Sequence, residues 1–100
     1  MTQVPLPVSV VVVTRNASAT LGECLSAIAQ NQPAEILVVD GNSTDGTTEI
    51  AREHTDRILS DGGKGLAYAR QLGAEQAPQE YLAYVDADVV LTTGALATML

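Results

Sequence analysis

Two carboxylates, Asp86 and Asp88, lie within an apolar run that begins at Tyr81. The run, residues 81–90, is short and rich in Val, Leu and Tyr, which predicts a strand buried on both faces. A spacing of two places both carboxylates on one side of an extended backbone. Two like charges held close together are costly unless a cation lies between them. The pair therefore predicts a site for Mg²⁺ or Mn²⁺, although an acidic turn after a strand would explain the same residues.

The rest of the chain alternates between short β-branched runs and segments of helical period. Thr20 and Glu23 have the spacing of a capping box at the start of the first helix. Strands are expected over 8–13, 35–40, 57–59 and 81–90, and helices from Leu21 to about 31, over 47–54 and over 66–76. This alternation predicts a Rossmann-like, three-layer α/β/α domain with a mostly parallel sheet, formed by residues 1–100 as one unit.

Polar residues follow three of the predicted strands directly. They are Thr14-Arg15-Asn16, the turn-forming segment 40–46, and Asp86 to Asp88. Ligands of parallel sheets bind at the carboxyl ends of the strands. We therefore expect these three segments to meet at one edge of the sheet and to form a site there.

The composition excludes several classes of protein. A net charge of −7 argues against nucleic acid and anionic membrane surfaces as partners. The single cysteine, Cys24, cannot form an internal disulfide and favours a reducing, cytoplasmic location. No apolar run reaches the length of a membrane span, and the polar, proline-bearing start does not resemble a signal peptide.

Two common nucleotide-binding motifs are absent from the expected places. The segment after the first strand, 14–19, contains no glycine, so it does not match a dinucleotide-binding fingerprint. Lys64 is followed by Gly65 rather than by Ser or Thr, so the loop around it is not a P-loop.

Four segments in register do match a known family. Residues 8–16, 38–47, 63–70 and 84–88 resemble, in this order, the nucleotide-binding half of the family 2 glycosyltransferases, which have the GT-A fold. The resemblance covers nearly the whole chain. It implies the donor-binding part of an enzyme that transfers a sugar from a UDP- or GDP-sugar to an acceptor that the sequence does not identify.

The resemblance assigns roles to the first two loops. Thr14, Arg15 and Asn16 match the loop that lines the nucleotide pocket, and Asp40 matches the acidic residue that hydrogen-bonds the base or ribose. Simpler roles remain open at this point. Arg15 could be a solvated surface charge, Asn16 could cap the first helix, and Asp40 could cap a turn.

The resemblance also assigns roles to the later loops. Lys64, Gly65 and Arg70 match the segment beside the donor sugar and diphosphate, with surface charge as the alternative for the two cations. Asp86 and Asp88 match the D-x-D pair, which holds the divalent metal on the diphosphate, and Asp86 is also expected to contact the nucleotide.

The resemblance further implies an inverting transfer whose general base and acceptor-binding half follow the D-x-D pair. Because the chain ends twelve residues after Asp88, we expect residues 1–100 alone to have little or no transferase activity and to self-associate through surface that the other half would cover. A longer protein could also associate with a membrane.

The main alternative to a glycosyltransferase is a non-catalytic nucleotide-binding or interaction module. A nucleotidyltransferase would need a glycine-rich loop after the first strand, which residues 14–20 do not provide.

Overall fold

The computed structural model describes residues 5–100 and contains four strands and four helices within that range. In chain order they are β1 (Leu6–Thr14), α1 (Leu21–Gln30), β2 (Pro33–Asp40), α2 (Thr47–Arg52), β3 (Ile58–Ser60), α3 (Leu66–Gln76), β4 (Tyr81–Asp86) and α4 (Ala95–Met99). The predicted alternation of strands and helices is confirmed, with most boundaries within two residues of those expected.

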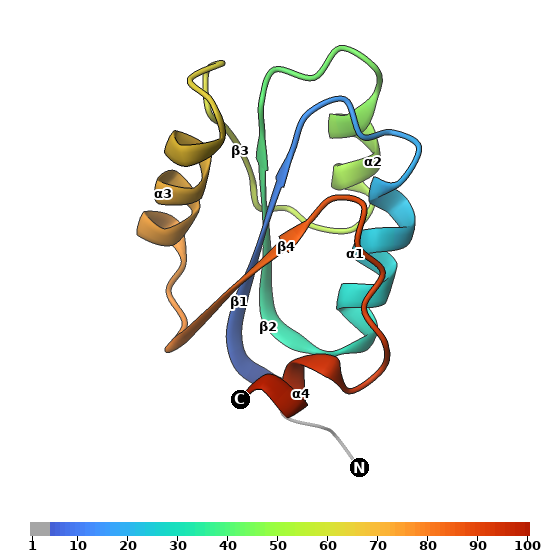
Figure 1. Ribbon diagram of the computed structural model, residues 1–100, viewed down its shortest axis with the longest axis vertical. Helices are drawn as coiled ribbons and strands as arrows, with labels where there is room; N and C mark the ends of the chain where they lie inside the picture. Colours follow the sequence, from blue (N-terminus) through green and yellow to red (C-terminus); the bar gives the residue numbers. More distant parts are fainter. Residues whose placement is uncertain (1–4) are drawn as a thin grey trace.

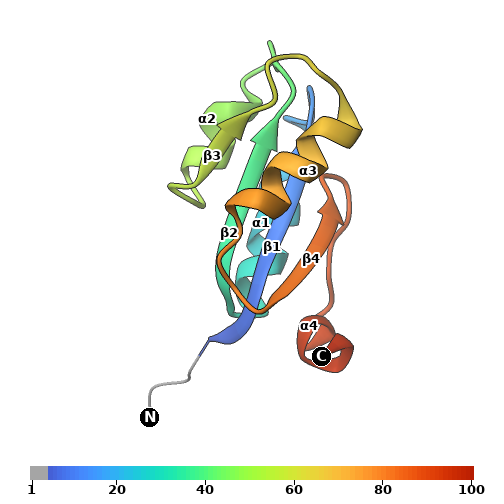
Figure 2. The ribbon, with the colours of Figure 1, turned by 90° about the vertical axis from the view of Figure 1, so that its left-hand side faces the viewer.

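The four strands form one sheet in the order β3-β2-β1-β4, and every neighbouring pair is parallel. The chain thus moves outward from β1 through β2 to β3, then returns across α3 to place β4 on the opposite side of β1 (Figure 2). This reversal at β1 is a topological switch point, where open α/β sheets bind ligands.

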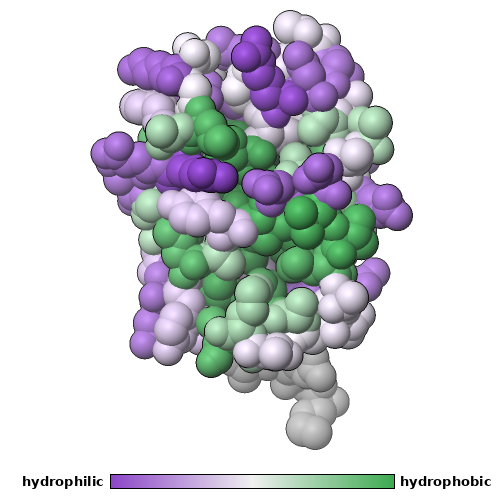
Figure 3. Space-filling model, viewed as in Figure 1, coloured by the Kyte–Doolittle hydropathy of each residue, from purple (hydrophilic) through white to green (hydrophobic). Residues whose placement is uncertain are grey.

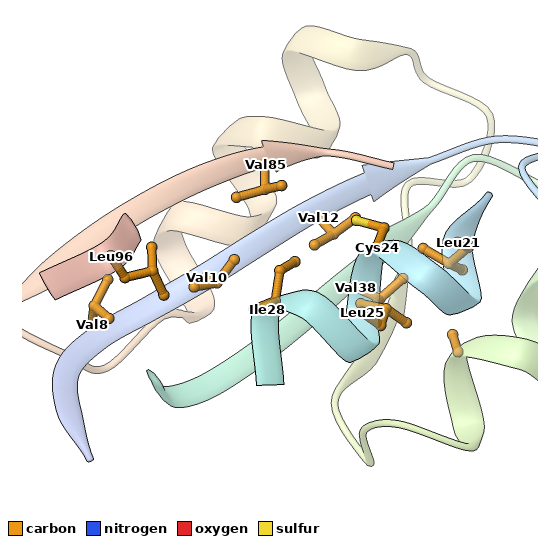
Figure 4. Close-up of a cluster of buried hydrophobic side chains, with 11 residues drawn as sticks. Val8, Val10, Val12, Leu21, Cys24, Leu25, Ile28, Val38, Val85 and Leu96 are labelled. Carbon is orange, nitrogen blue, oxygen red and sulfur yellow. The ribbon is translucent and has the colours of Figure 1, made fainter. Parts of the chain in front are cut away.

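Helices cover both faces of the sheet and make the three predicted layers (Figure 1). Alternate residues of β1 point to opposite faces. Val8, Val10 and Val12 join Leu25 and Ile28 of α1 in the larger core, which Figure 4 shows in close-up. On the opposite face, Val11, Leu37, Val39 and Ala69 form the smaller core under α3.

The smaller core depends on a close approach between α3 and β1. Gly73 of α3 is buried, and a Cβ built on it would lie 2.5 Å from Cγ1 of Val11. Only a residue without a side chain lets the helix rest on the strand at this distance.

Two expectations about local structure are wrong. The segment 81–90 is not a strand buried on both faces: β4 ends at Asp86, lies at the sheet edge, and exposes Tyr81 and Tyr84 by 46% each while burying Val85. Composition identifies a strand but not its place in the sheet. The capping box is also absent, because Thr20 occupies the N-cap of α1 without a side-chain cap hydrogen bond.

Within residues 5–100, no helix combines the length and apolar character needed to cross a membrane.

Candidate functional site

The strand ends converge as the sequence predicts. Thr14 of β1 lies opposite Asp40 of β2, which in turn lies opposite Ser60 of β3, and Val13 of β1 lies opposite Asp86 of β4. All four strands thus deliver polar residues to one edge. Figure 3 shows hydrophilic side chains gathered along this edge, above an apolar middle.

The loops after β1 and β2 are fastened to each other by hydrogen bonds between residues far apart in sequence. The backbone N–H of Asn16 donates to Ser43 Oγ at 2.8 Å, and Asn16 Oδ1 accepts from the backbone N–H of Thr44 at 2.8 Å. The Ala17 N–H donates to Thr47 Oγ1 at 2.9 Å. Asn16 therefore holds two loops together, and it does so with φ at 49°, in the left-handed region that Asn tolerates better than most residues.

Asp45 adds a further tie between the same loops. Its carboxylate accepts from the hydroxyl and the backbone N–H of Thr47 and from the backbone N–H of Ser18. These bonds, led by that of the Thr47 hydroxyl, lower the pKa of Asp45 to about 2. The ionised Asp45 carboxylate is therefore part of the hydrogen-bond network that holds the two loops together.

Asp40 is 5% exposed and organises the start of the second loop. Its Oδ1 accepts from Ser43 Oγ at 2.6 Å and its Oδ2 from the Ser43 N–H at 2.9 Å. These two bonds make Asp40 the cap of a turn, which is the simpler role that the sequence analysis named as an alternative. The predicted contact of Asp40 with a base or ribose stays a prediction.

A cavity of about 300 Å³ opens beside these loops. It is lined from three strand ends by Thr14, Arg15, Gly41, Asp61, Gly65 and Leu66, among others. Of the residues predicted to bind the nucleotide sugar, Thr14, Arg15 and Gly65 therefore lie on its wall. The volume is at the lower limit of small-molecule sites.

Three of the five basic residues of this acidic chain come from segments at this edge, namely Arg15, Lys64 and Arg70. All three are exposed, and the ion pair found within residues 5–100 involves none of them: it joins Arg57 and Glu35 at 3.1 Å. Lys64 Nζ lies 4.7 Å from the ring centroid of Tyr68. Arg15 lines the cavity and Lys64 lies between two of its lining residues, Gly63 and Gly65, so these two cations are suited to phosphate groups there. Arg70 lies within α3 and is not among the residues that line the cavity.

Asp86 and Asp88 lie in the exposed turn at the end of β4. Both carboxylates are near Cys24, which is fully buried on α1 and donates its S–H to the Asp86 carbonyl at 3.4 Å. Burial first, and then the charges of Asp88 and Asp86, raise the pKa of the Cys24 thiol to about 11. The backbone of the turn is thus held against α1 through Cys24, while both carboxylates remain exposed.

The donor set of this turn fits a hard divalent cation. Among residues 5–100 no side-chain hydrogen bond or ion pair engages either carboxylate, and no cluster of three or more acidic, His or Cys ligands surrounds them. Mg²⁺ is commonly held by one or two carboxylates while water and substrate phosphates complete its coordination. Asp86 and Asp88 can supply such a pair.

Sequence comparison identifies the family. A family model described as "Glycosyl transferase family 2" matches residues 9–100. The chain belongs to the family 2 glycosyltransferases. It is 33% identical over 88 residues to the lipopolysaccharide core biosynthesis glycosyltransferase LpsC of Rhizobium meliloti, covering 83% of this chain and 32% of the relative. It is 36% identical over 91 residues to the glycosyltransferase AglE of Haloferax volcanii, covering 81% and 30%. The chain therefore spans about a third of the length of these relatives.

Solved glycosyltransferases share the fold of this family 2 chain. The mannosyltransferase PcManGT of Pyrobaculum calidifontis, in complex with GDP-Man and Mn²⁺, matches with a TM-score of 0.82 and 28% identity, covering 94% of this chain and 32% of that one. TarS 1-349 of S. aureus, in complex with UDP-GlcNAc, matches with a TM-score of 0.83 and 26% identity, covering 92% and 29%. The Rossmann-like GT-A architecture is thus confirmed.

One residue of the cavity wall was missed by the sequence analysis. Asp61 is 4% exposed and follows β3 directly. The sequence signal was the one used for the other strands, a polar residue immediately after a strand. The glycines after Asp61 and the brevity of β3 concealed it.

Proposed function

We propose that this chain is the nucleotide-sugar-binding part of a metal-dependent, inverting glycosyltransferase that uses a UDP- or GDP-sugar. The observation that supports it most directly is the meeting, at one edge of a family 2 sheet, of a cavity, free cations and the Asp86/Asp88 pair. Residues 1–100 would then form one donor-binding domain. The acceptor site and the general base would come from sequence beyond it.

Each part of the edge has a role in this proposal. Thr14 would line the nucleoside pocket and Gly65 would lie beside the donor sugar and diphosphate, with Asn16 holding the loop and Asp40 reaching the base or ribose. Arg15, Lys64 and Arg70 face the diphosphate and the donor sugar. Their positive charge would favour the leaving group, which gains negative charge as the glycosidic bond breaks.

Asp86 and Asp88 would hold Mg²⁺ or Mn²⁺, with Asp86 also near the ribose. Such a cation, when bound, acts as a Lewis acid on the diphosphate. Because both carboxylates are exposed, we expect their affinity for the metal alone to be weak and to rise when phosphate oxygens complete its coordination.

Calorimetric titration of the full chain with UDP and GDP, each with and without Mn²⁺, tests this function. The variant Asp86→Asn/Asp88→Asn should lose the metal-dependent part of binding, about tenfold or more in Kd, because one lost charged interaction is already worth a factor of this size. A matched control, Glu53→Gln/Asp56→Asn, removes two exposed carboxylates between α2 and β3 and should bind as the native protein does.

Binding that ignores both the metal and the Asp86/Asp88 substitutions would contradict the metal-dependent function. It would favour the alternative, a non-catalytic nucleotide-binding module in which these carboxylates only shape a turn.

A further inference from the structure

The turn that carries Asp86 and Asp88 is closed by its own backbone. The Val89 N–H donates to the Asp86 carbonyl oxygen at 3.0 Å, so residues 86–89 form a β-turn in which Asp86 is the first residue and Asp88 the third. Beyond this turn, the described structure has no helix or strand until α4 begins at Ala95. The place of both carboxylates therefore depends on what holds this segment against the rest of the protein.

At its first residue the turn is held by α1. Cys24 is fully buried and points from α1 toward Val12 of β1 (Figure 4), and its S–H donates to the same Asp86 carbonyl at 3.4 Å. A backbone carbonyl has two lone pairs, so Val89 and Cys24 together satisfy this oxygen. Ala87, between the two carboxylates, packs against the core that contains Cys24. The backbone that carries the acidic pair is thus fixed to α1 by a hydrogen bond and by apolar contact.

Further along the same helix, Asn31 holds the other end of segment 86–96. Asn31 is the C-cap of α1 and is 7% exposed. Its side-chain nitrogen donates to the Ala27 carbonyl at 3.0 Å and to the Thr92 carbonyl at 3.2 Å, while its Oδ1 accepts from the Leu96 N–H at 3.1 Å. Positions 24 and 31 are about two helical turns apart, so both side chains lie on one face of the helix, separated by about 10 Å along its axis.

Holding the segment at both ends matters for metal binding. When metal ligands lie on a mobile loop, binding must also order that loop, and the lost conformational entropy lowers the affinity. A loop that is already fixed by hydrogen bonds presents its carboxylates without this cost. Removing the hydrogen bonds that support metal ligands commonly lowers metal affinity about tenfold or more.

We propose that Cys24 and Asn31 are positioning residues for the metal pair: they fix segment 86–96 on one face of α1, so that the carboxylates of Asp86 and Asp88 are placed before a divalent cation and a diphosphate bind. This inference rests on the proposed function and adds to it two buried side chains that contact the backbone of the segment rather than the metal or the nucleotide.

The test measures, on the full chain, the ratio of the Kd for UDP without Mn²⁺ to the Kd for UDP with Mn²⁺. Cys24→Ala and Asn31→Ala should each lower this ratio about tenfold and leave binding without the metal unchanged. Cys24→Ser, which returns a hydroxyl donor to the same position, should restore most of the ratio.

Ile28→Val is the matched control, because it removes a methyl group from the same core and the same helix without removing a hydrogen-bond donor. It should lower Tm and leave the ratio unchanged. An equal fall of the ratio in Ile28→Val, or in Cys24→Ser, would indicate a general effect of core stability and would overturn the positioning role.

A measurement on the native protein decides the question if the alanine variants do not fold. Without metal or nucleotide, the amide protons of Val89 and Leu96 should exchange with solvent at least about tenfold more slowly than in an unfolded chain, because both already make hydrogen bonds. Free exchange that slows only when Mg²⁺ and UDP are added would mean that the ligands order the segment, and it would contradict the proposal.

The two possible failures give different results. A native protein whose affinity for UDP does not rise with Mn²⁺ would contradict the proposed function, and this inference with it. A native rise that persists in full in Cys24→Ala and Asn31→Ala would overturn only the role of these two residues.

Discussion

A Cβ on Gly41 would lie 3.4 Å from Oδ2 of Asp61 and 3.4 Å from Cβ of Arg15. Gly41 does not have the positive φ that would itself demand glycine. The backbone therefore accepts alanine at 41, but the added methyl group occupies cavity space between Asp61 and Arg15.

Gly41→Ala should accordingly weaken UDP binding about tenfold, because the methyl group fills part of a cavity that is already small for the nucleoside. Calorimetry would measure this loss. Gly22→Ala is the control: its Cβ would make an ordinary 3.6 Å contact with Ile50, and alanine in α1 should raise stability by about 0.5–1 kcal/mol without changing affinity. Unchanged UDP binding in Gly41→Ala would show that no ligand atom approaches this position.

Removing the unpaired cations one at a time should distinguish contacts with the diphosphate from contacts with the nucleoside. We expect Arg15→Ala and Lys64→Ala each to weaken UDP binding about tenfold, as for a charge-assisted hydrogen bond, and to leave uridine binding nearly unchanged. Parallel titrations with UDP and uridine measure the difference. Arg52→Ala, which removes an exposed cation on α2, should affect neither ligand. An equal loss for uridine would place these side chains beside the nucleoside instead.

The contact between Gly73 and Val11 makes a prediction about stability. A methyl group 2.5 Å from Val11 Cγ1 cannot be accommodated without moving α3 or the strand. Gly73→Ala should therefore lower the free energy of unfolding by about 1–3 kcal/mol, as overpacked cores do. Urea denaturation would measure it. Adding Val11→Ala removes the methyl groups that the new Cβ would meet. The double variant should therefore be more stable than the sum of the two single destabilisations predicts. Strict additivity would show that the two residues are not in contact.

Asp45 should make stability depend on pH in acid. Its pKa of about 2 in the folded protein lies below the ordinary 3.8, so the folded state binds this proton less readily than the unfolded chain. The contribution of Asp45 is therefore complete above about pH 4 and is lost as the pH falls toward 2. Thermal unfolding of the native protein and of Asp45→Asn between pH 2 and 5 would reveal it. The difference in Tm between the two should shrink as the pH falls, and a constant difference would contradict the assignment.

The sequence was sufficient to predict the order of strands and helices and the edge at which polar loops meet, because both follow from periodicity and from the parallel sheet. It could not show that β4 leaves Tyr81 and Tyr84 exposed, since burial depends on which elements pack against a strand. Nor could it show that Thr47 and Asp45, rather than a capping box at Thr20, bond the backbone ahead of α1, because those residues are distant in sequence. Asp61 was missed because its burial arises from the packing of three loops.

The ties among Asn16, Ser43 and Thr44 also have a thermodynamic meaning for a ligand. A loop that is mobile before binding must lose conformational entropy when it closes on its ligand, and part of the binding free energy offsets that loss. Here the two loops restrain each other through bonds that span 27 and 28 residues, so this wall of the cavity is ordered during folding. Contacts made there can contribute to affinity with little of that penalty. If the hydrogen bonds between the loops were weakened, the loops would be mobile before binding, and ordering them would lower the affinity for the ligand even though no ligand-binding atom had changed.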